Sequence, residues 1–304
     1  MVYSAKSDTS TISQFTRRKS ITINTNGTST PALYQTKLTI LYSPGMNADF
    51  SDIRFNTKSG TYIDYWIESK VDSDTAYVWV ELIDVIADPG SDSIWMYYGN
   101  AAVSDGGVGG DTFVFFDDFS GDLSKWTTAG TPTILDGILT LDSAGEAVRS
   151  INTYGAYGVS LTARFCPPVS TVSHTWGFSE VAVGTNPVGN INYRFAGWQF
   201  HLDGAIYITT GNGAGFTQPS VGAYTTDYGE YRIDWTNTEV KFYKNNVLLG
   251  TNTLNIPSTA LYVNLYATTG TSLFDYVFVR KYASPEPTAT LGTAQHQRRI
   301  PTFL

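Results

Sequence analysis

The sequence of 304 residues has few of the residues that several common sites and folds need. It contains one cysteine, Cys166, so no disulfide can form within the chain, and we expect that residue to be a buried thiol. One cysteine and three scattered histidines cannot make a zinc site. Lys and Arg number 19 against 27 Asp and Glu, which gives a formal net charge of −8. This balance argues against nucleic-acid binding, which needs a basic face.

Long apolar runs are also missing from the sequence. No segment approaches the ~20 apolar residues of a membrane-spanning helix. Residues 1–15 contain no apolar core of signal-peptide length. A position outside the cell would therefore require either a leader that has been removed or the release of virions by cell lysis.

The residues that are abundant favour an all-β protein. Aromatic residues make up 14% of the sequence, and 28 Gly stand beside only 15% charged residues. This composition is typical of turn-rich β-structure. Apolar residues, 42% of the chain, are enough for one or two packed cores. Strand-like blocks in the first half lie at 20–24, 34–42, 52–56, 62–68, 76–82 and 93–99.

The spacing of these blocks predicts two β-sandwich domains, at 1–110 and 111–283. We place the boundary in the segment 101–111, which is rich in glycine and has the composition of a turn, with no helix after it. Strand patterns resume at Phe113. Among them, Asn245-Asn246 predicts a tight type I′ hairpin because both residues tolerate positive φ.

Residues 284–304 are predicted to be a C-terminal arm or linker. Pro285 and Pro287 flank Glu286 and argue against a regular strand or helix there. The end of the arm is either a peptide that docks on other subunits of an assembly or an ordinary floppy end. Its candidate docking residues are Arg298, Arg299, Ile300, Pro301, Phe303 and Leu304.

Particular blocks of the sequence resemble known families. The set DFSDIRF (49–55), YWIES (65–69), VWVEL (78–82), SIWMYYGN (93–100) and FFDDF (115–119) resembles a domain of unknown function of archaeal and bacterial surface proteins. That domain usually precedes a concanavalin-like or laminin-G-like jelly roll. Residues 231–249 and 273–282 resemble the hairpin and closing strand of laminarinase-type glucanases and laminin-G-like domains. The resemblance implies a concanavalin A-like jelly roll as the second domain, displayed outside a cell or on a virion.

The residues of glucanase catalysis are not found in the sequence. Laminarinase-type enzymes carry Glu-x-Asp-x-x-Glu on one strand, and retaining hydrolysis needs two carboxyl groups about 5 Å apart. Glu180 has no such partner, and Glu230 and Asp234 have the wrong spacing. We expect Asp234 to lie on a solvated face. The sequence thus predicts a protein that is not an enzyme, with no catalytic residues.

A structural calcium ion is predicted from the same resemblance. In such jelly rolls the first and last strands lie side by side and often hold Ca²⁺, which prefers carboxylate and carbonyl oxygens. The corresponding residues here are Asp117, Asp118 and Asp275. The alternatives are a hydrogen-bonded role for Asp118 at a strand edge and a capped turn for Asp275.

Strand alternation predicts a glycan-binding face on the second domain. Val159, Leu161, Ala163 and Phe165 are expected in the core, as are Trp198, Phe200 and Leu202, and Leu261, Val263 and Leu265. The opposite positions combine flat rings with hydrogen-bonding groups, the mixture that binds sugars. The alternative is a solvent face or an interface with another subunit. The predicted ligand-binding residues are Arg164, Gln199, His201, Tyr262, Asn264 and Tyr266.

Together these patterns predict a non-enzymatic surface or virion protein for attachment or decoration. Its expected partners are glycans or a glycosylated host surface, and its expected location is the virion surface or the extracellular space. The main alternative is a purely structural assembly subunit whose Tyr-rich faces contact other chains. A glycoside hydrolase is the third possibility.

Overall fold

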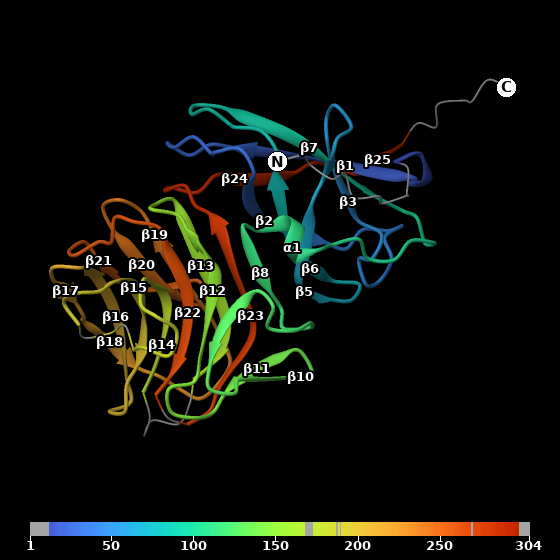
Figure 1. Ribbon diagram of the computed structural model, residues 1–304. Helices are drawn as coiled ribbons and strands as arrows, with labels where there is room; N and C mark the ends of the chain where they lie inside the picture. The colour runs from blue at the N-terminus through green and yellow to red at the C-terminus, as the bar shows by residue number, and fades with distance from the viewer. Residues whose placement is uncertain (1–11, 168–172, 187, 189, 269, 298–304) are drawn as a thin grey trace. The chain divides into compact units, whose positions relative to one another are not determined.

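The structure is a computed structural model that describes residues 12–167, 173–186, 188, 190–268 and 270–297 (Figure 1). It consists almost entirely of antiparallel strands and divides into two compact units. Unit 1 is the chain up to Phe113 and again from Ala283, and unit 2 is Val114–Tyr282. Unit 2 is thus an insertion in the sequence of unit 1. The prediction of an all-β chain with two β-sandwich domains is confirmed.

Unit 1 contains two sheets. Its elements are η1 (Ile12–Gln14), β1 (Arg17–Asn24), β2 (Tyr34–Leu41), β3 (Arg54–Thr57), β4 (Tyr62–Ile63), β5 (Tyr65–Val71), β6 (Thr75–Leu82), β7 (Ser91–Tyr98), α1 (Gly109–Thr112), β24 (Thr288–Leu291) and β25 (Gln295–His296). One sheet has the strand order β24-β1-β7-β3-β4, with β25 also on β1, and the other has the order β2-β6-β5. The single helical turn α1 was not expected after the Gly-rich segment.

Alternating apolar side chains of both sheets form the core of unit 1. Leu38 and Ile40 of β2 pack in one cluster with Val78 of β6 and with Ile21 and Ile94 of the other sheet. Burial of each such side chain contributes about 1.5–3 kcal/mol. The alternation of apolar residues in the strand-like blocks of the first half therefore reflects one core that both sheets share.

Two buried charged residues of the DFSDIRF block fix the chain that leaves β7. Asp52 is 0% exposed, and its carboxylate accepts hydrogen bonds from the backbone N–H groups of Gly99 (2.7 Å) and Asn100 (3.2 Å). Arg54 donates to the hydroxyl of Tyr65 (3.0 Å) and to the carbonyl of Ser104 (2.7 Å). Because buried charges must be hydrogen-bonded, these two side chains hold the segment after β7 against the sheet.

The C-terminal segment is part of the sheet of unit 1. Ile21 and Ile23 of β1 lie opposite Leu291 and Ala289 of β24, and β25 continues the pairing further along β1 (Figure 1). The prediction of an arm without strands was wrong at 288–291 and 295–296. Proline removes a donor only at its own position, and both prolines precede β24. The candidate docking residues 298–304 lie outside the described residues.

Removal of residues 288–304 should lower the melting temperature of unit 1, because β1 would become an unpaired edge and Ala289 and Leu291 would leave the core. Unit 2 should keep its transition. The matched control removes only residues 298–304 and leaves β24 and β25 in place. The measurement is thermal unfolding by circular dichroism, and equal stability of the two truncated proteins would contradict the pairing.

Unit 2 is a jelly roll of two sheets. The first, here called the β13 sheet, has the order β10-β11-β23-β13-β19-β20-β21, with β8 also on β23. Its strands are β8 (Phe115–Asp117), β10 (Thr133–Leu135), β11 (Ile138–Leu141), β13 (Val159–Cys166), β19 (Gly229–Trp235), β20 (Val240–Lys244), β21 (Val247–Asn252) and β23 (Ser272–Lys281). The second, here called the β14 sheet, has the order β17-β16-β15-β14-β22-β12-β9, with β18 also on β16. Its strands are β9 (Trp126–Ala129), β12 (Ala147–Tyr154), β14 (His174–Ser179), β15 (Arg194–Phe200), β16 (Ala205–Asn212), β17 (Phe216–Thr217), β18 (Ser220–Ala223) and β22 (Leu261–Ala267).

The core of unit 2 confirms the alternation expected from the sequence, with one exception. The predicted core residues of β13, β15 and β22 are buried between the two sheets. Leu202 is the exception, with 59% of its surface exposed, because β15 ends at Phe200 and Leu202 lies in the following turn. The predicted hairpin is confirmed as well. Asn245 and Asn246 have φ of 49° and 64° and join β20 to β21.

The cysteine differs from its expected environment. Cys166 ends β13 and is only half-buried, and its thiol donates to the carbonyl of Thr226 (3.0 Å). Burial raises the pKa of the thiol, and the negative charge of Asp227 adds to the shift. Among the described residues, no helix has the length and apolar character needed to cross a membrane.

Candidate functional site

The outward face of the β14 sheet, here called the β14 face, carries five of the six predicted ligand-binding residues. Tyr262, Asn264 and Tyr266 alternate along β22 with the buried residues of the same strand. Tyr266 lies opposite Thr175 of β14, which lies opposite Gln199 of β15. The pairing of neighbouring strands therefore places these side chains in rows across the sheet.

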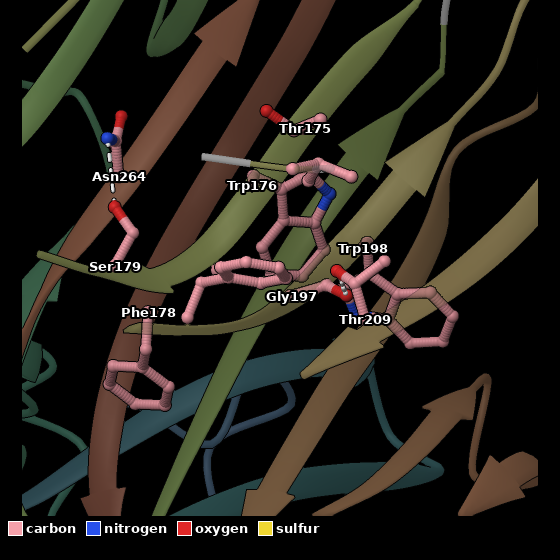
Figure 2. Close-up of a pocket in the computed structure, with 11 residues that line it drawn as sticks. Thr175, Trp176, Phe178, Ser179, Gly197, Trp198, Thr209 and Asn264 are labelled. Carbon is pink, nitrogen blue, oxygen red and sulfur yellow. Dashed lines mark hydrogen bonds between the residues drawn. The ribbon is translucent and has the colours of Figure 1, made fainter. Parts of the chain in front are cut away.

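A small hollow lies at the centre of the β14 face (Figure 2). Its volume open to the centre of a water molecule is about 10 Å³, which is room for about one water. Its floor is bare backbone, because Gly177 lies opposite Gly197. A Cβ on Gly177 would lie 2.4 Å from the carbonyl oxygen of Ala196, and its φ of 150° also disfavours other residues. The residues around the floor include Thr175, Ser179, Thr209 and Asn264.

Among the outward-facing residues that line the hollow, two have a polar atom that is buried and hydrogen-bonds to no described group of the protein. The two atoms are Oγ1 of Thr175, in a residue 1% exposed, and Oδ1 of Asn264, in a residue 2% exposed. The amide of Asn264 uses its other end to donate to Oγ of Ser179 at 3.1 Å, as Figure 2 shows. An unsatisfied buried polar atom costs about 1–3 kcal/mol. Both atoms therefore keep hydrogen-bonding capacity that the described part of the protein does not use.

Arg149 of β12 borders the hollow on the side of β22. It lies opposite Asn264, and its guanidinium sits over the ring of Tyr262, 4.2 Å from the ring centre. One of its terminal nitrogens donates to the carbonyl of Val181 at 3.0 Å. Sequence analysis did not single out Arg149, Thr175 or Ser179.

His201 follows the end of β15 at the margin of the β14 face. Its Nδ1 lies 3.1 Å from Oδ1 of Asp203, and Tyr207 donates to Oδ2 of the same carboxylate at 2.9 Å. The backbone N–H of Ala205 holds the pKa of Asp203 below its usual value, while the bond to Asp203 raises the pKa of Tyr207. Nearby, Gln199 accepts a hydrogen bond from Gln218.

Arg164 does not belong to the β14 face. It lies on β13, in the other sheet, where its alternation with the core residues of that strand turns it outward. The outward faces of two packed sheets point in opposite directions. Arg164 forms an ion pair of 2.7 Å with Asp275 and lies over the ring of Tyr228. The prediction of one face with all six residues is therefore wrong for Arg164.

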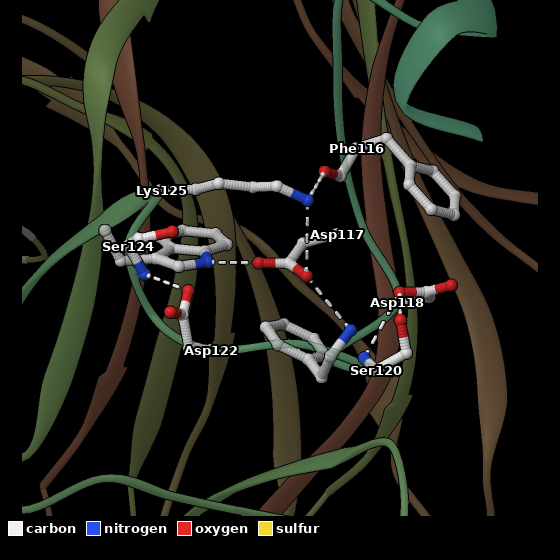
Figure 3. A network of polar contacts seen from close by, with 9 residues as sticks. Phe116, Asp117, Asp118, Ser120, Asp122, Ser124 and Lys125 are labelled. Atoms are coloured by element: carbon white, nitrogen blue, oxygen red, sulfur yellow. Dashed lines mark hydrogen bonds and ion pairs between the residues drawn. The ribbon is translucent and has the colours of Figure 1, made fainter. Parts of the chain in front are cut away.

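The three aspartates of the predicted calcium site do not meet. Asp117, labelled in Figure 3, is 2% exposed. Its carboxylate accepts hydrogen bonds from Nε1 of Trp126 (2.6 Å) and the backbone N–H of Phe119 (3.0 Å). Asp118 binds the N–H and hydroxyl of Ser120 instead. Asp275 is paired with Arg164. In the described part of the chain, no three His, Cys, Asp or Glu side chains could hold a metal ion together. Each of the three carboxylates thus has a partner within the chain, and the calcium ion stays a prediction.

Paired carboxylates are also missing from the outward positions of β14, which are Thr175, Gly177 and Ser179. Glu180 follows directly and forms an ion pair of 3.0 Å with Arg194. Glu230 and Asp234 lie on β19, in the β13 sheet. Asp234 was expected on a solvated face but is 2% exposed, and it accepts a hydrogen bond of 2.7 Å from Ser160.

Comparisons with known proteins found one family model and a set of solved structures. A family model described as a domain of unknown function, DUF2341, matches residues 49–129. The resemblance drawn from the sequence is thus confirmed. The match begins in unit 1 and extends through β8 and β9 of unit 2. No curated protein matches the chain.

Solved structures similar to the chain include several glucanases. A β-glucanase of Bacillus licheniformis has 17% identity, with 55% of this chain and 97% of that chain covered and a TM-score of 0.44. A Mycobacterium tuberculosis protein described as an immunostimulatory antigen and pseudo β-1,3-glucanase has 16% identity, with 56% and 99% covered and a TM-score of 0.45. A lichenase derived from a mouse hindgut metagenome has 14% identity, with 56% and 99% covered and a TM-score of 0.45.

Substitution of Asp117 by Ala should lower the free energy of unfolding of unit 2 by about 2 kcal/mol or more, because the buried N–H groups of Trp126 and Phe119 would lose their acceptor. The matched control, Asp118→Ala, removes a carboxylate that serves the surface residue Ser120 and should cost much less. Chemical denaturation measures both. Melting curves with and without a chelator test the calcium ion, and an unchanged melting temperature would count against it. A lower melting temperature with chelator, absent in Asp275→Ala, would support the calcium ion instead.

Proposed function

We propose that the protein is a non-enzymatic attachment or decoration protein that binds a glycan on the β14 face of unit 2. The observation that supports this most is the hollow, with two buried polar atoms that hydrogen-bond to no described group of the protein, beside the half-buried rings of Tyr262 and Tyr266. Sugar hydroxyls need donors and acceptors, and the C–H faces of a pyranose pack on aromatic rings.

The size of the hollow limits how a glycan binds. Room for about one water cannot hold a sugar ring. One hydroxyl group would enter between Thr175 and Asn264, while the ring itself would lie across the face. Tyr266 lies opposite Thr175 and next but one to Asn264 along β22, so it is placed to contact such a ring.

The absence of hydrolysis is part of the proposal. Retaining hydrolysis needs two carboxyl groups about 5 Å apart and inverting hydrolysis about 6.5–9.5 Å. None of the described residues that line the hollow is acidic. Glu180 is held by the guanidinium of Arg194 and by its backbone N–H.

The proposed location is outside the cell or on a virion, which is what the resemblance of the sequence blocks at 49–119 to a domain of surface proteins implies. The second candidate is a structural subunit of an assembly. The exposed edge strand β21 favours it, since Val247 and Leu248 are 62% and 48% exposed. A glycan array probed with the whole protein separates the two functions, because a purely structural subunit would bind no glycan.

Substitutions in β22 distinguish the residues that would bind a glycan from the residues that stabilise the core. Tyr262→Ala and Tyr266→Ala should each weaken glycan binding about tenfold, as expected for loss of a ring contact near 1–1.5 kcal/mol, and leave the melting temperature nearly unchanged. The matched control is Leu265→Ala on the buried side of the same strand, which should cost about 2–5 kcal/mol of folding stability. Unfolding by either tyrosine variant would show that the rings belong to the core.

The protein should release no reducing ends from β-glucans such as laminarin. Glu180→Gln should leave this zero rate unchanged, because Glu180 has no second carboxylate to work with. The assay is a reducing-sugar measurement over long incubation. Release of sugar that Glu180→Gln abolishes would overturn the non-enzymatic function.

A further inference from the structure

We propose that the glycan bound on the β14 face is anionic and that Arg149 binds its carboxylate or sulfate group. This inference rests on the proposed function and names the class of sugar.

Arg149 is the arginine of unit 2 that lacks a carboxylate partner among the described residues. Unit 2 contains five arginines. The other four lie within 4.0 Å of a carboxylate, in the pairs Arg164–Asp275, Arg194–Glu180, Arg232–Asp234 and Arg280–Asp234. Arg149 has a carbonyl and a ring for neighbours instead, and its Nε is buried and hydrogen-bonds to no described group.

The surroundings of Arg149 hold its guanidinium in a fixed orientation. The ring of Tyr262 supports one face of the group, 4.2 Å from the ring centre. The carbonyl of Val181 holds one terminal nitrogen. A guanidinium fixed in this way keeps other N–H groups for a carboxylate or a sulfate, two oxygens of which can accept parallel hydrogen bonds. Little side-chain entropy is then lost when the anion binds.

Arg149 lies on the strand next to that of Asn264, which lines the hollow. Arg149 lies directly opposite Asn264 in the pairing of β12 with β22, and directly opposite side chains have Cβ atoms about 4.5–5.5 Å apart. Asn264 Oδ1 is the unpartnered acceptor of the hollow. A sugar whose hydroxyl group donates a hydrogen bond to Oδ1 of Asn264 can therefore place a charged substituent beside the guanidinium of Arg149.

The net charge of the chain opposes the binding of an anion. Binding therefore depends on whether the attraction by Arg149 exceeds this repulsion. A formal charge of −8 repels anions at long range. At physiological ionic strength, however, the Debye length is about 8 Å, and charges on exposed groups beyond that distance are largely screened. The half-buried guanidinium of Arg149 acts at contact distance, where screening is weak. Local attraction therefore exceeds the general repulsion.

The test compares matched oligosaccharides that differ only in charge. The probes are a neutral hexose oligomer, the same backbone with uronic acid carboxylates, and the same backbone with sulfate esters. Dissociation constants are measured by calorimetry with the whole protein. We expect at least one anionic probe to bind about tenfold or more tightly than the neutral one, in line with the strength of hydrogen bonds to charged groups. This preference should fall as salt is raised.

Arg149→Gln should abolish the preference for the anionic probe and change the dissociation constant of the neutral probe less than about threefold. Arg149→Lys, which keeps the charge without the planar fork, should retain part of the preference. The matched control is Arg164→Gln, an arginine that also lies beside a tyrosine ring but on the β13 sheet, and it should change nothing. Melting curves confirm that each variant is folded.

The outcomes separate this inference from the function on which it rests. Equal binding of neutral and anionic probes, lost in Tyr266→Ala, would leave glycan binding in place and overturn the role of Arg149. A preference that persists in folded Arg149→Gln would also overturn it. Failure of every probe to bind would overturn both. A purely structural role for Arg149 would lower the melting temperature without changing the choice between probes.

Discussion

The close approach of β14 and β15 at two facing glycines is the constraint on which the candidate site depends. A Cβ on Gly197 would lie 2.7 Å from the carbonyl oxygen of Trp176, and a Cβ on Gly177 would meet the backbone of β15 even more closely. Neither position can carry a side chain, so the outward face is hollow there. On the other side of the same strands, Trp176 and Trp198 are almost completely buried in the core. One strand pairing thus builds both the hydrophobic layer of unit 2 and the hollow above it.

Alternation predicted much of the fold and part of the site. Two-residue periodicity in 261–266 was enough to separate Leu261, Val263 and Leu265 from Tyr262 and Tyr266, because the pleat turns successive side chains to opposite faces. It could not assign Arg164, since alternation says which residues of one strand share a face but not which sheet contains the strand. Alternation also could not show which partners the aspartates predicted as calcium ligands would have. The indole of Trp126 holds Asp117, while Arg164 holds Asp275.

Some of the residues that were not predicted could have been found from the sequence pattern, and others could not. Thr175 and Ser179 alternate with Trp176 and Phe178, so the same rule applied to 174–179 would have placed them on the outward face. Arg149 left no such signal. The register of β12 against β22 shifts between Arg149 and Thr153, and a bulge of this kind breaks the two-residue pattern. The strand β24 was hidden by the prolines before it, although the alternate burial of Ala289 and Leu291 follows a strand pattern.

Unit 2 is inserted in the sequence of unit 1, and its two ends lie side by side. Asp117 of β8 lies opposite Val277 of β23, and the N–H of Val114 donates to the carbonyl of Val279 at 3.0 Å. The first and last strands of the jelly roll therefore pair with each other, so the chain enters and leaves the unit at neighbouring positions. An inserted domain of this kind can change the residues on its outward faces without disturbing the sheet that receives it, because its core is closed by its own two sheets. Under the proposed function, specificity for a glycan then depends on a few outward side chains of β12, β14 and β22. The fold itself depends on the inward side chains of the same strands.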